Sequence, residues 1–195
     1  YALDILLEYL IDGKRAPLNE VMIDEDGVTS EISGFNYTKE IAGEWYLFIP
    51  ANAGEDIDGL LTSLENAFAR IEENSLSQAD LDRIKAGIEV SFYQNVQSAL
   101  GKAISLGEYN VYTGDPAFLT TDIERLDAVP PKAVMDVYER YIKDKPRISV
   151  SFVPKGEPAL ALEGSVKANI VEEQIVAGEG APPDFNPAAR VLEER

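Results

Sequence analysis

Apolar residues recur at intervals of three or four positions along residues 77–106, the spacing that places side chains on one face of an α-helix. A helix of this length would extend over roughly 40 Å and form the spine of the fold. Ser77 and Asp80 suit its first turn as capping residues. Because Phe92 and Val96 lie in the middle of the apolar stripe, we expect both to be buried. The stripe consists of Leu81, Ile84, Ile88, Phe92, Val96, Leu100 and Ile104.

The same periodicity predicts further helices before and after the long one. Residues Ala2–Ile11 form the first of them, and Gly13 is suited to end it. A loop is expected over 107–115, because Gly114, Asp115 and Pro116 are typical of a turn. The other predicted helical segments are a short turn after Pro17, a helix that begins at Asp56 or Asp58, residues 118–126, and a helix after Pro130 and Pro131.

Alternation of polar and apolar residues predicts β-structure in three places. Residues 28–37 and 42–49 alternate and are joined by a short polar link at 38–40, which is typical of an antiparallel hairpin. Residues 147–153 alternate again, with Ile148, Val150 and Phe152 on one face. The predicted fold class is therefore α+β, an antiparallel sheet packed by helices with one long spine helix.

Composition divides the chain into a domain over residues 1–156 and a linker or extension over 157–195. Pro, Gly, Ala and Glu dominate the second part, as in segments that connect domains, although 165–176 could form one strand. The chain opens in the middle of a helical pattern at Tyr1 without a methionine. We therefore expect it to be a piece of a longer protein, with the extension leading to a following domain.

The charge and the missing residue types exclude several function classes. With 17 basic and 35 acidic residues the formal charge is -18, which disfavours binding to nucleic acid or to anionic membranes. No run is apolar enough for membrane insertion. The chain has no histidine and no cysteine, so Ser-His, Cys-His and histidine-containing zinc sites are excluded.

Two groups of acidic residues could suggest a site, and neither fits one well. Asp24, Glu25 and Asp26 lack the alternating oxygen ligands and distant Glu of a calcium loop, so a solvated turn is the better interpretation. Glu172 and Glu173 have no positioned partner for acid–base chemistry. We predict no catalytic, cofactor-binding or metal-binding residue in this chain.

The order of the elements resembles the M16 metallopeptidases, the insulysin and pitrilysin group that includes the processing-peptidase subunits. The resemblance covers residues 1–156 and rests on local signatures in chain order. These are APLNEVMIDEDGVTSEISGF, the hairpin end WYLFIPA, the helical run LLTSLENAFARIEENSLSQADLDRIKAGIEVSF, then GDP, LDAVPPKAVMDVYERYI and ISVSFVPKG. They are similar to the later part of the family's repeated domain, which follows the zinc-bearing domain.

The resemblance implies a role without chemistry of its own. In the family, zinc is held by an HxxEH motif and a downstream Glu in the preceding domain, and those residues are not in this sequence. An Arg and a Tyr that help to hold substrate in the catalytic half flank the equivalent of Gly27; the matching positions here are Ile23 and Ser30. The implied function is a chamber-wall domain of a zinc metallopeptidase whose halves close around peptide substrates.

Two other functions and the assembly of the chain stay open at this stage. A scaffold subunit without peptidase activity is the main alternative, and an unrelated binding module is a third. Expected partners are the other M16-like domains of the parent chain, and a periplasmic location is suggested by analogy only. Free sheet edges recruit strands, so we expect either 165–176 to cover its own sheet or two copies to form a homodimer.

Overall fold

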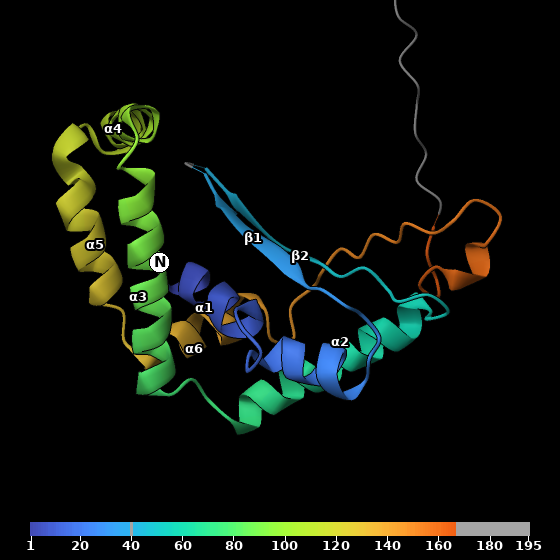
Figure 1. The fold of residues 1–195 in the computed structure, drawn as a ribbon. Helices are drawn as coiled ribbons and strands as arrows, with labels where there is room; N and C mark the ends of the chain where they lie inside the picture. The colour runs from blue at the N-terminus through green and yellow to red at the C-terminus, as the bar shows by residue number, and fades with distance from the viewer. Residues whose placement is uncertain (40, 167–195) are drawn as a thin grey trace, which may run out of the picture. The chain divides into compact units, whose positions relative to one another are not determined.

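The structure is a computed structural model that describes residues 1–39 and 41–166, of which Tyr1–Glu163 form one compact unit. One hairpin follows the first two helical elements of this unit, and the later elements are helices and short helical turns (Figure 1). In chain order the elements are α1 (Ala2–Ile11), the π-helical turn η1 (Asn19–Glu25), β1 (Ser33–Thr38), β2 (Gly43–Phe48), α2 (Ile57–Glu73), α3 (Gln78–Asn95), α4 (Ala99–Thr113), the 3-10 turn η2 (Pro116–Phe118), α5 (Leu119–Asp127), α6 (Pro131–Tyr141) and the 3-10 turn η3 (Pro158–Leu160).

Helix α1 lies at the centre of the hydrophobic core. Ile5, Leu6 and Leu10 are completely inaccessible to solvent. The helix packs against α6, α3 and β1, so different sides of it contact different elements (Figure 1). The predicted helix over Ala2–Ile11 is thus confirmed. The core around it is completed by Leu18, Met22, Ile71, Leu81, Val134 and Tyr138.

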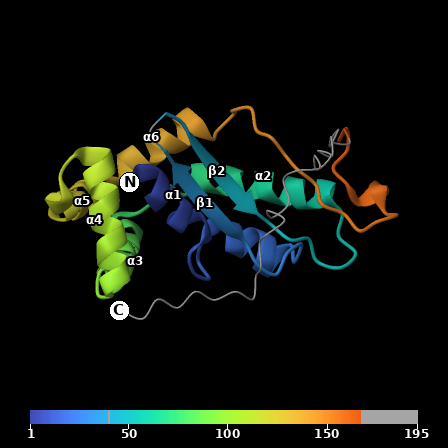
Figure 2. The ribbon, with the colours of Figure 1, turned by 90° about the horizontal axis from the view of Figure 1, so that it is seen from above.

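The two strands form an antiparallel hairpin, which lies across α1 when seen from above (Figure 2). Ser33 is paired with Phe48 and Thr38 with Gly43, so the hairpin begins later than the predicted residue 28. Trp45 and Leu47 pack against the core on one face of the sheet. The α+β fold with an antiparallel sheet packed by helices is confirmed.

A buried hydroxyl joins the segments that lead into and out of the hairpin. Thr29 is almost fully buried, and its Oγ1 donates toward the carbonyl oxygens of Pro50 at 2.6 Å and Glu31 at 2.8 Å. A single bridge pairs Thr29 with Ala51, and the Asn52 amide donates to the Val28 carbonyl at 2.9 Å. Breaking these contacts would leave a buried hydroxyl without a partner, which costs free energy. They therefore hold the two ends of the hairpin together.

The acidic end of η1, Asp24 to Asp26, contacts helix α2. Ser63 Oγ donates to Asp26 Oδ2 at 2.6 Å, and Arg70 donates to both carboxylate oxygens of Glu25 at 2.6 and 2.7 Å. The hydrogen bond from Arg70 lowers the pKa of Glu25. The turn is therefore a structural contact as well as a solvated segment.

The prediction of one continuous helix over 77–106 is wrong in its extent. Ser77 caps α3 as expected, but α3 ends at Asn95, and Ser98 caps a second helix by accepting a hydrogen bond from the Gly101 amide at 2.9 Å. A Cβ on Gly101 would lie 2.0 Å from the carbonyl oxygen of Asn95. Only glycine allows α4 to begin this close to the end of α3.

The break in the helix also corrects the predicted core. Phe92 and Val96 are only half-buried, because they lie in the last turn before the break. Leu100 is 70% exposed and Ile104 51% exposed, so the apolar stripe does not continue as one buried face. The buried residues of α3 are Leu81 and Ile84, near its N-terminus.

Two further predictions differ from the structure. Residues 107–113 belong to α4 and not to a loop; the helix ends only at Gly114, whose φ of 73° is the left-handed conformation of a C-terminal glycine. Residues 147–153 form no strand, and Ile148 and Phe152 are 94% and 86% exposed. The expected strand at 165–176 falls almost wholly outside the described residues.

Two helical glycines provide a matched test of the break. Gly87 in α3 has open space where a Cβ would lie, so Gly87→Ala should raise the free energy of unfolding by about 0.5–1 kcal/mol through helix propensity. Gly101→Ala gains the same propensity but collides with backbone, so it should lower that free energy by about 1–3 kcal/mol. Urea denaturation measures both. Equal stabilisation by the two variants would contradict the close contact.

Candidate functional site

A broad groove lies between the tip of the hairpin and the helices α3, α4 and α5. Its volume is about 1160 Å³. Three groups of residues line it: Tyr37, Lys39 and Glu44 at the hairpin tip, Phe92, Glu108, Tyr109 and Tyr112 on α3 and α4, and Phe118, Asp122 and Arg125 on η2 and α5. The break between α3 and α4 creates the second group, because α4 turns its residues toward the hairpin side.

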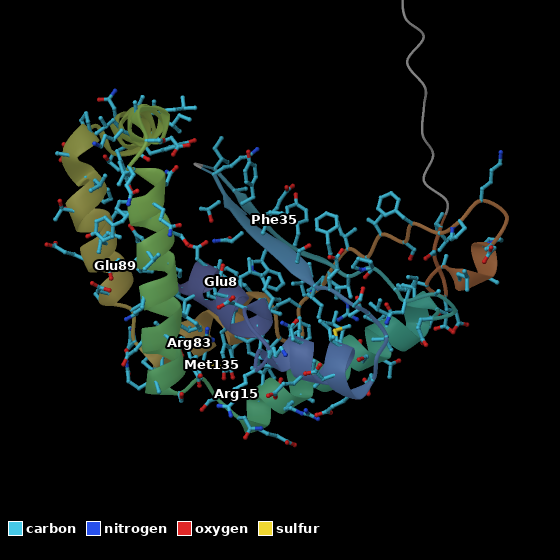
Figure 3. The ribbon with its side chains drawn as sticks, in the orientation of Figure 1. Glu8, Arg15, Phe35, Arg83, Glu89 and Met135 are labelled. Atoms are coloured by element: carbon cyan, nitrogen blue, oxygen red, sulfur yellow. The ribbon has the colours of Figure 1, made fainter. Side chains whose placement is uncertain are left out.

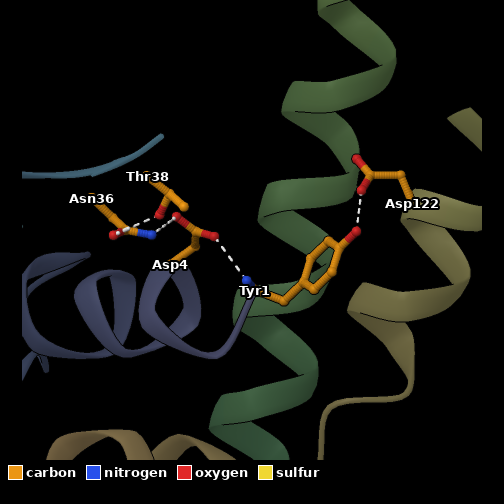
Figure 4. Close-up of polar contacts among 5 residues, drawn as sticks. All are labelled: Tyr1, Asp4, Asn36, Thr38 and Asp122. Atoms are coloured by element: carbon orange, nitrogen blue, oxygen red, sulfur yellow. Dashed lines mark hydrogen bonds and ion pairs between the residues drawn. The ribbon is translucent and has the colours of Figure 1, made fainter. Parts of the chain in front are cut away.

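Asp122 is the polar centre of the helical side of the groove. The hydroxyl of Tyr1 donates to Asp122 Oδ1 (Figure 4). The hydroxyl of Tyr109 donates to Asp122 Oδ2 at 2.7 Å. Burial, followed by the hydrogen bond to Asp122, raises the pKa of Tyr1 to about 12. The same two causes raise the pKa of Tyr109. Both tyrosines therefore stay protonated and hold Asp122 in place.

A second contact in Figure 4 fixes the hairpin relative to α1. Asn36 Nδ2 donates to Asp4 Oδ1 at 2.7 Å, and Thr38 Oγ1 donates to Asn36 Oδ1 at 3.3 Å. Since Asp4 belongs to α1 and Asn36 to β1, these bonds tie the strand to the central helix. The hairpin tip that borders the groove is thereby held by a helix of the core.

Two cations of the groove already lie over aromatic rings. Lys39 Nζ is 4.5 Å from the centre of the Tyr37 ring, and Arg125 Cζ is 4.9 Å from that of Phe118. Such contacts attract a cation to the negative face of the ring. The groove therefore contains two cations that rings stabilise and three carboxylates, which are Glu44, Glu108 and Asp122.

The outward face of the hairpin carries four exposed aromatic residues next to the groove. Phe35 projects from this face (Figure 3), and it is 59% exposed. Tyr37, Tyr46 and Phe48 complete the set, with Phe35 opposite Tyr46 in the strand register. Tyr37 and its cross-strand partner Glu44 also line the groove, so the two surfaces are continuous.

Ile23 and Ser30, which the resemblance to the M16 family matched to a substrate-holding Arg and Tyr, do not line this groove. Ile23 is half-buried in η1, and Ser30 is exposed just after the buried Thr29. Neither has a guanidinium or phenol group. No sequence pattern indicated the groove residues, because Tyr109 and Asp122 are 13 positions apart and meet only through the turn between α4 and α5.

Within residues 1–39 and 41–166, no three His, Cys, Asp or Glu side chains lie close enough together to hold a metal ion. In the same part of the chain, no helix combines the length and the apolar character needed to cross a bilayer.

Comparisons with known proteins identify the fold. No sequence-family profile matches the chain, and no curated protein matches it in sequence. Among solved structures, a zinc protease from Bordetella pertussis superposes with a TM-score of 0.68 at 18% identity, over 78% of this chain and 83% of that one. An inactive domain of a peptidase M16 from Pseudomonas fluorescens gives 0.56 at 18% identity, over 73% of this chain and 33% of that one.

The chain has the fold of an M16 zinc protease domain. A third structure, the periplasmic protease PqqL from Escherichia coli, also superposes, with a TM-score of 0.56 and 16% identity over 72% of this chain. The chain spans 83% of the Bordetella structure, but only 33% of the Pseudomonas chain and 15% of PqqL. The resemblance to the M16 family is thus confirmed at the level of the fold.

Asp122→Asn tests the polar centre of the groove through the titration of the tyrosines. Because the pKa of Tyr1 and Tyr109 is raised, the folded state favours the neutral form of both side chains. This contribution to the free energy of unfolding is fully present below pH 10 and is lost as the pH rises toward 12. Removing the carboxylate charge should shift part of the phenolate absorbance at 295 nm to lower pH. Burial is the larger cause of the raised tyrosine pKa, and it remains in the variant. The pKa of the two tyrosines should therefore fall only part of the way toward the ordinary value.

Asp127→Asn is the matched control, because Asp127 ends the same helix and its hydrogen bond to Lys85 uses the backbone carbonyl only. Its titration curve should coincide with that of the unmodified chain. An unchanged curve for Asp122→Asn would contradict the assigned hydrogen bonds.

Proposed function

We propose that this chain is a non-catalytic domain of an M16-like zinc metallopeptidase. It forms part of the wall of the chamber that holds peptide substrates and supports the domain that binds zinc. Peptide hydrolysis belongs to the parent protein, and the zinc is held by a preceding domain. No catalytic, cofactor-binding or metal-binding residue is assigned to this chain.

The fold carries this proposal. The domain superposes on a peptidase M16 domain whose description calls it inactive, and on a structure described as a zinc protease. The whole sequence lacks histidine and cysteine, so it cannot supply an HxxEH motif. Ile23 and Ser30 stand where the resemblance places the substrate-holding Arg and Tyr of a catalytic half.

The alternative is a scaffold subunit of the same fold in a protein without peptidase activity. An HxxEH motif in another domain of the same protein separates the two functions, since it supplies the zinc ligands that this chain lacks. A periplasmic location is proposed on the likeness to PqqL, which is described as a periplasmic protease.

The expected partners are the other M16-like domains of the parent chain. Among the described residues, β1 and β2 pair only with each other, so their outer edges are free and the aromatic face of the hairpin is exposed. Free edges and apolar faces of this kind favour docking of another strand or domain.

From the same free edges we propose that the isolated chain forms a homodimer. Light scattering at several concentrations should show a mass that rises toward twice 21.4 kDa. A chain that stays strictly monomeric up to millimolar concentration would contradict pairing between two copies. The sheet edges would then be binding surfaces for a different domain.

The isolated chain should neither bind zinc tightly nor cleave peptides, because it offers no matched set of ligands. Calorimetry with zinc chloride should give no sub-micromolar affinity, and a quenched-fluorescence peptide mixture should stay intact with and without zinc. Cleavage that follows the chain through purification would overturn the proposed function.

A further inference from the structure

The chain has two sulfur atoms, and they lie in different surroundings. The sequence contains two methionines, Met22 and Met135, and no cysteine. Met22 lies in η1 and is completely inaccessible to solvent. Met135 lies on α6, where Figure 3 labels it; its side chain is half-buried and packs against the hydrophobic core. A small oxidant dissolved in water can therefore reach Met135 in the folded protein, whereas Met22 is shielded.

Met135 belongs to a helix that contacts two other helices of the core. Helix α6 packs against α1, and its residues Val134 and Tyr138 are fully or almost fully buried. The centre of the Tyr138 ring lies 6.0 Å from that of Phe68 in α2. Residues three positions apart are neighbours on a helix surface, so Met135 lies beside Tyr138 at the border of the buried face. A change in the polarity of Met135 therefore acts on the packing of α6 against the core.

From this position we infer that Met135 is a site of reversible oxidation by hydroperoxides, and that its oxidised form weakens the packing of α6. The thioether sulfur attacks one oxygen of hydrogen peroxide and the O–O bond breaks. The transferred oxygen gives its proton to the departing hydroxide, which leaves as water. Sulfur loses two electrons to the peroxide, and the product is methionine sulfoxide.

The sulfoxide differs from methionine in the property that matters at this border. Its oxygen makes a flexible apolar side chain polar. A polar group that is buried in an apolar contact without a hydrogen bond costs free energy. Reduction by a methionine sulfoxide reductase restores the thioether, so the contact of α6 with the core can be weakened and re-formed without new synthesis of the protein.

Hydrogen peroxide added to the full 195-residue chain tests which sulfur is reactive. Mass spectrometry of the digested protein follows the gain of one oxygen atom at each methionine. Oxidation should be on the order of tenfold faster at Met135 than at Met22, because Met22 reacts only when the fold opens. In urea that unfolds the chain, the two rates should become equal. Equal rates in the folded protein would overturn the assignment.

Urea denaturation tests the effect on the packing of α6. Conversion of Met135 to its sulfoxide should lower the urea midpoint, and a methionine sulfoxide reductase should return it to the starting value. Met135→Gln places a polar group of similar length at this position, so it should lower the midpoint without peroxide. An unchanged midpoint after full oxidation of Met135 would overturn the proposed weakening of α6.

Two leucine variants provide matched controls, since Leu and Met exchange with little change in core volume. Met135→Leu should have a midpoint close to that of the unmodified chain and should not respond to peroxide. Met22→Leu removes the other sulfur and should respond as the unmodified chain does. If peroxide lowers the midpoint of Met135→Leu by the same amount, the effect arises elsewhere and the inference is overturned. None of these outcomes depends on the proposed wall role.

Discussion

Burial of helix α1 is the constraint on which the remaining structure depends. Its side chains contact α6, α3 and β1, and Ile5, Leu6 and Leu10 have no exposed surface. At about 1.5–3 kcal/mol for each fully buried Leu or Ile, this short helix contributes several kcal/mol to folding. It also positions the hairpin, since Asp4 accepts a hydrogen bond from Asn36 in β1. By contrast, α3, the first part of the helix expected to be the spine, buries only Leu81 and Ile84 near its N-terminus.

The second constraint is the break between α3 and α4. Ser98 caps the new helix, and Gly101 lacks the side chain that would collide with the carbonyl of Asn95. Because α4 changes direction there, Tyr109 reaches Asp122 and α4 borders the groove. A continuous helix would leave these residues far from the hairpin tip. The close contact at Gly101 thus belongs to the turn that brings α4 to the groove.

The proposed role fits this division between core and groove. The core residues build a domain of the M16 type, whereas the groove and the aromatic hairpin face are surfaces that the core does not use. A wall domain needs such surfaces, because it holds other domains or peptides without performing chemistry.

Signals that are local in the chain were enough to predict α1, the hairpin, the α+β class and a start of α2 at Asp56 or Asp58, of which Asp56 is the cap. The helical periodicity of apolar residues continues across Ser98, so the sequence did not indicate the break between α3 and α4. Alternation of polar and apolar residues predicted a strand at 147–153, which pairs with nothing among the described residues. Which helix is central, and where the aromatic residues meet, depended on tertiary packing. The reason is that burial of α1 and the contact of Asp122 with two tyrosines join segments far apart in the chain, which no local pattern records.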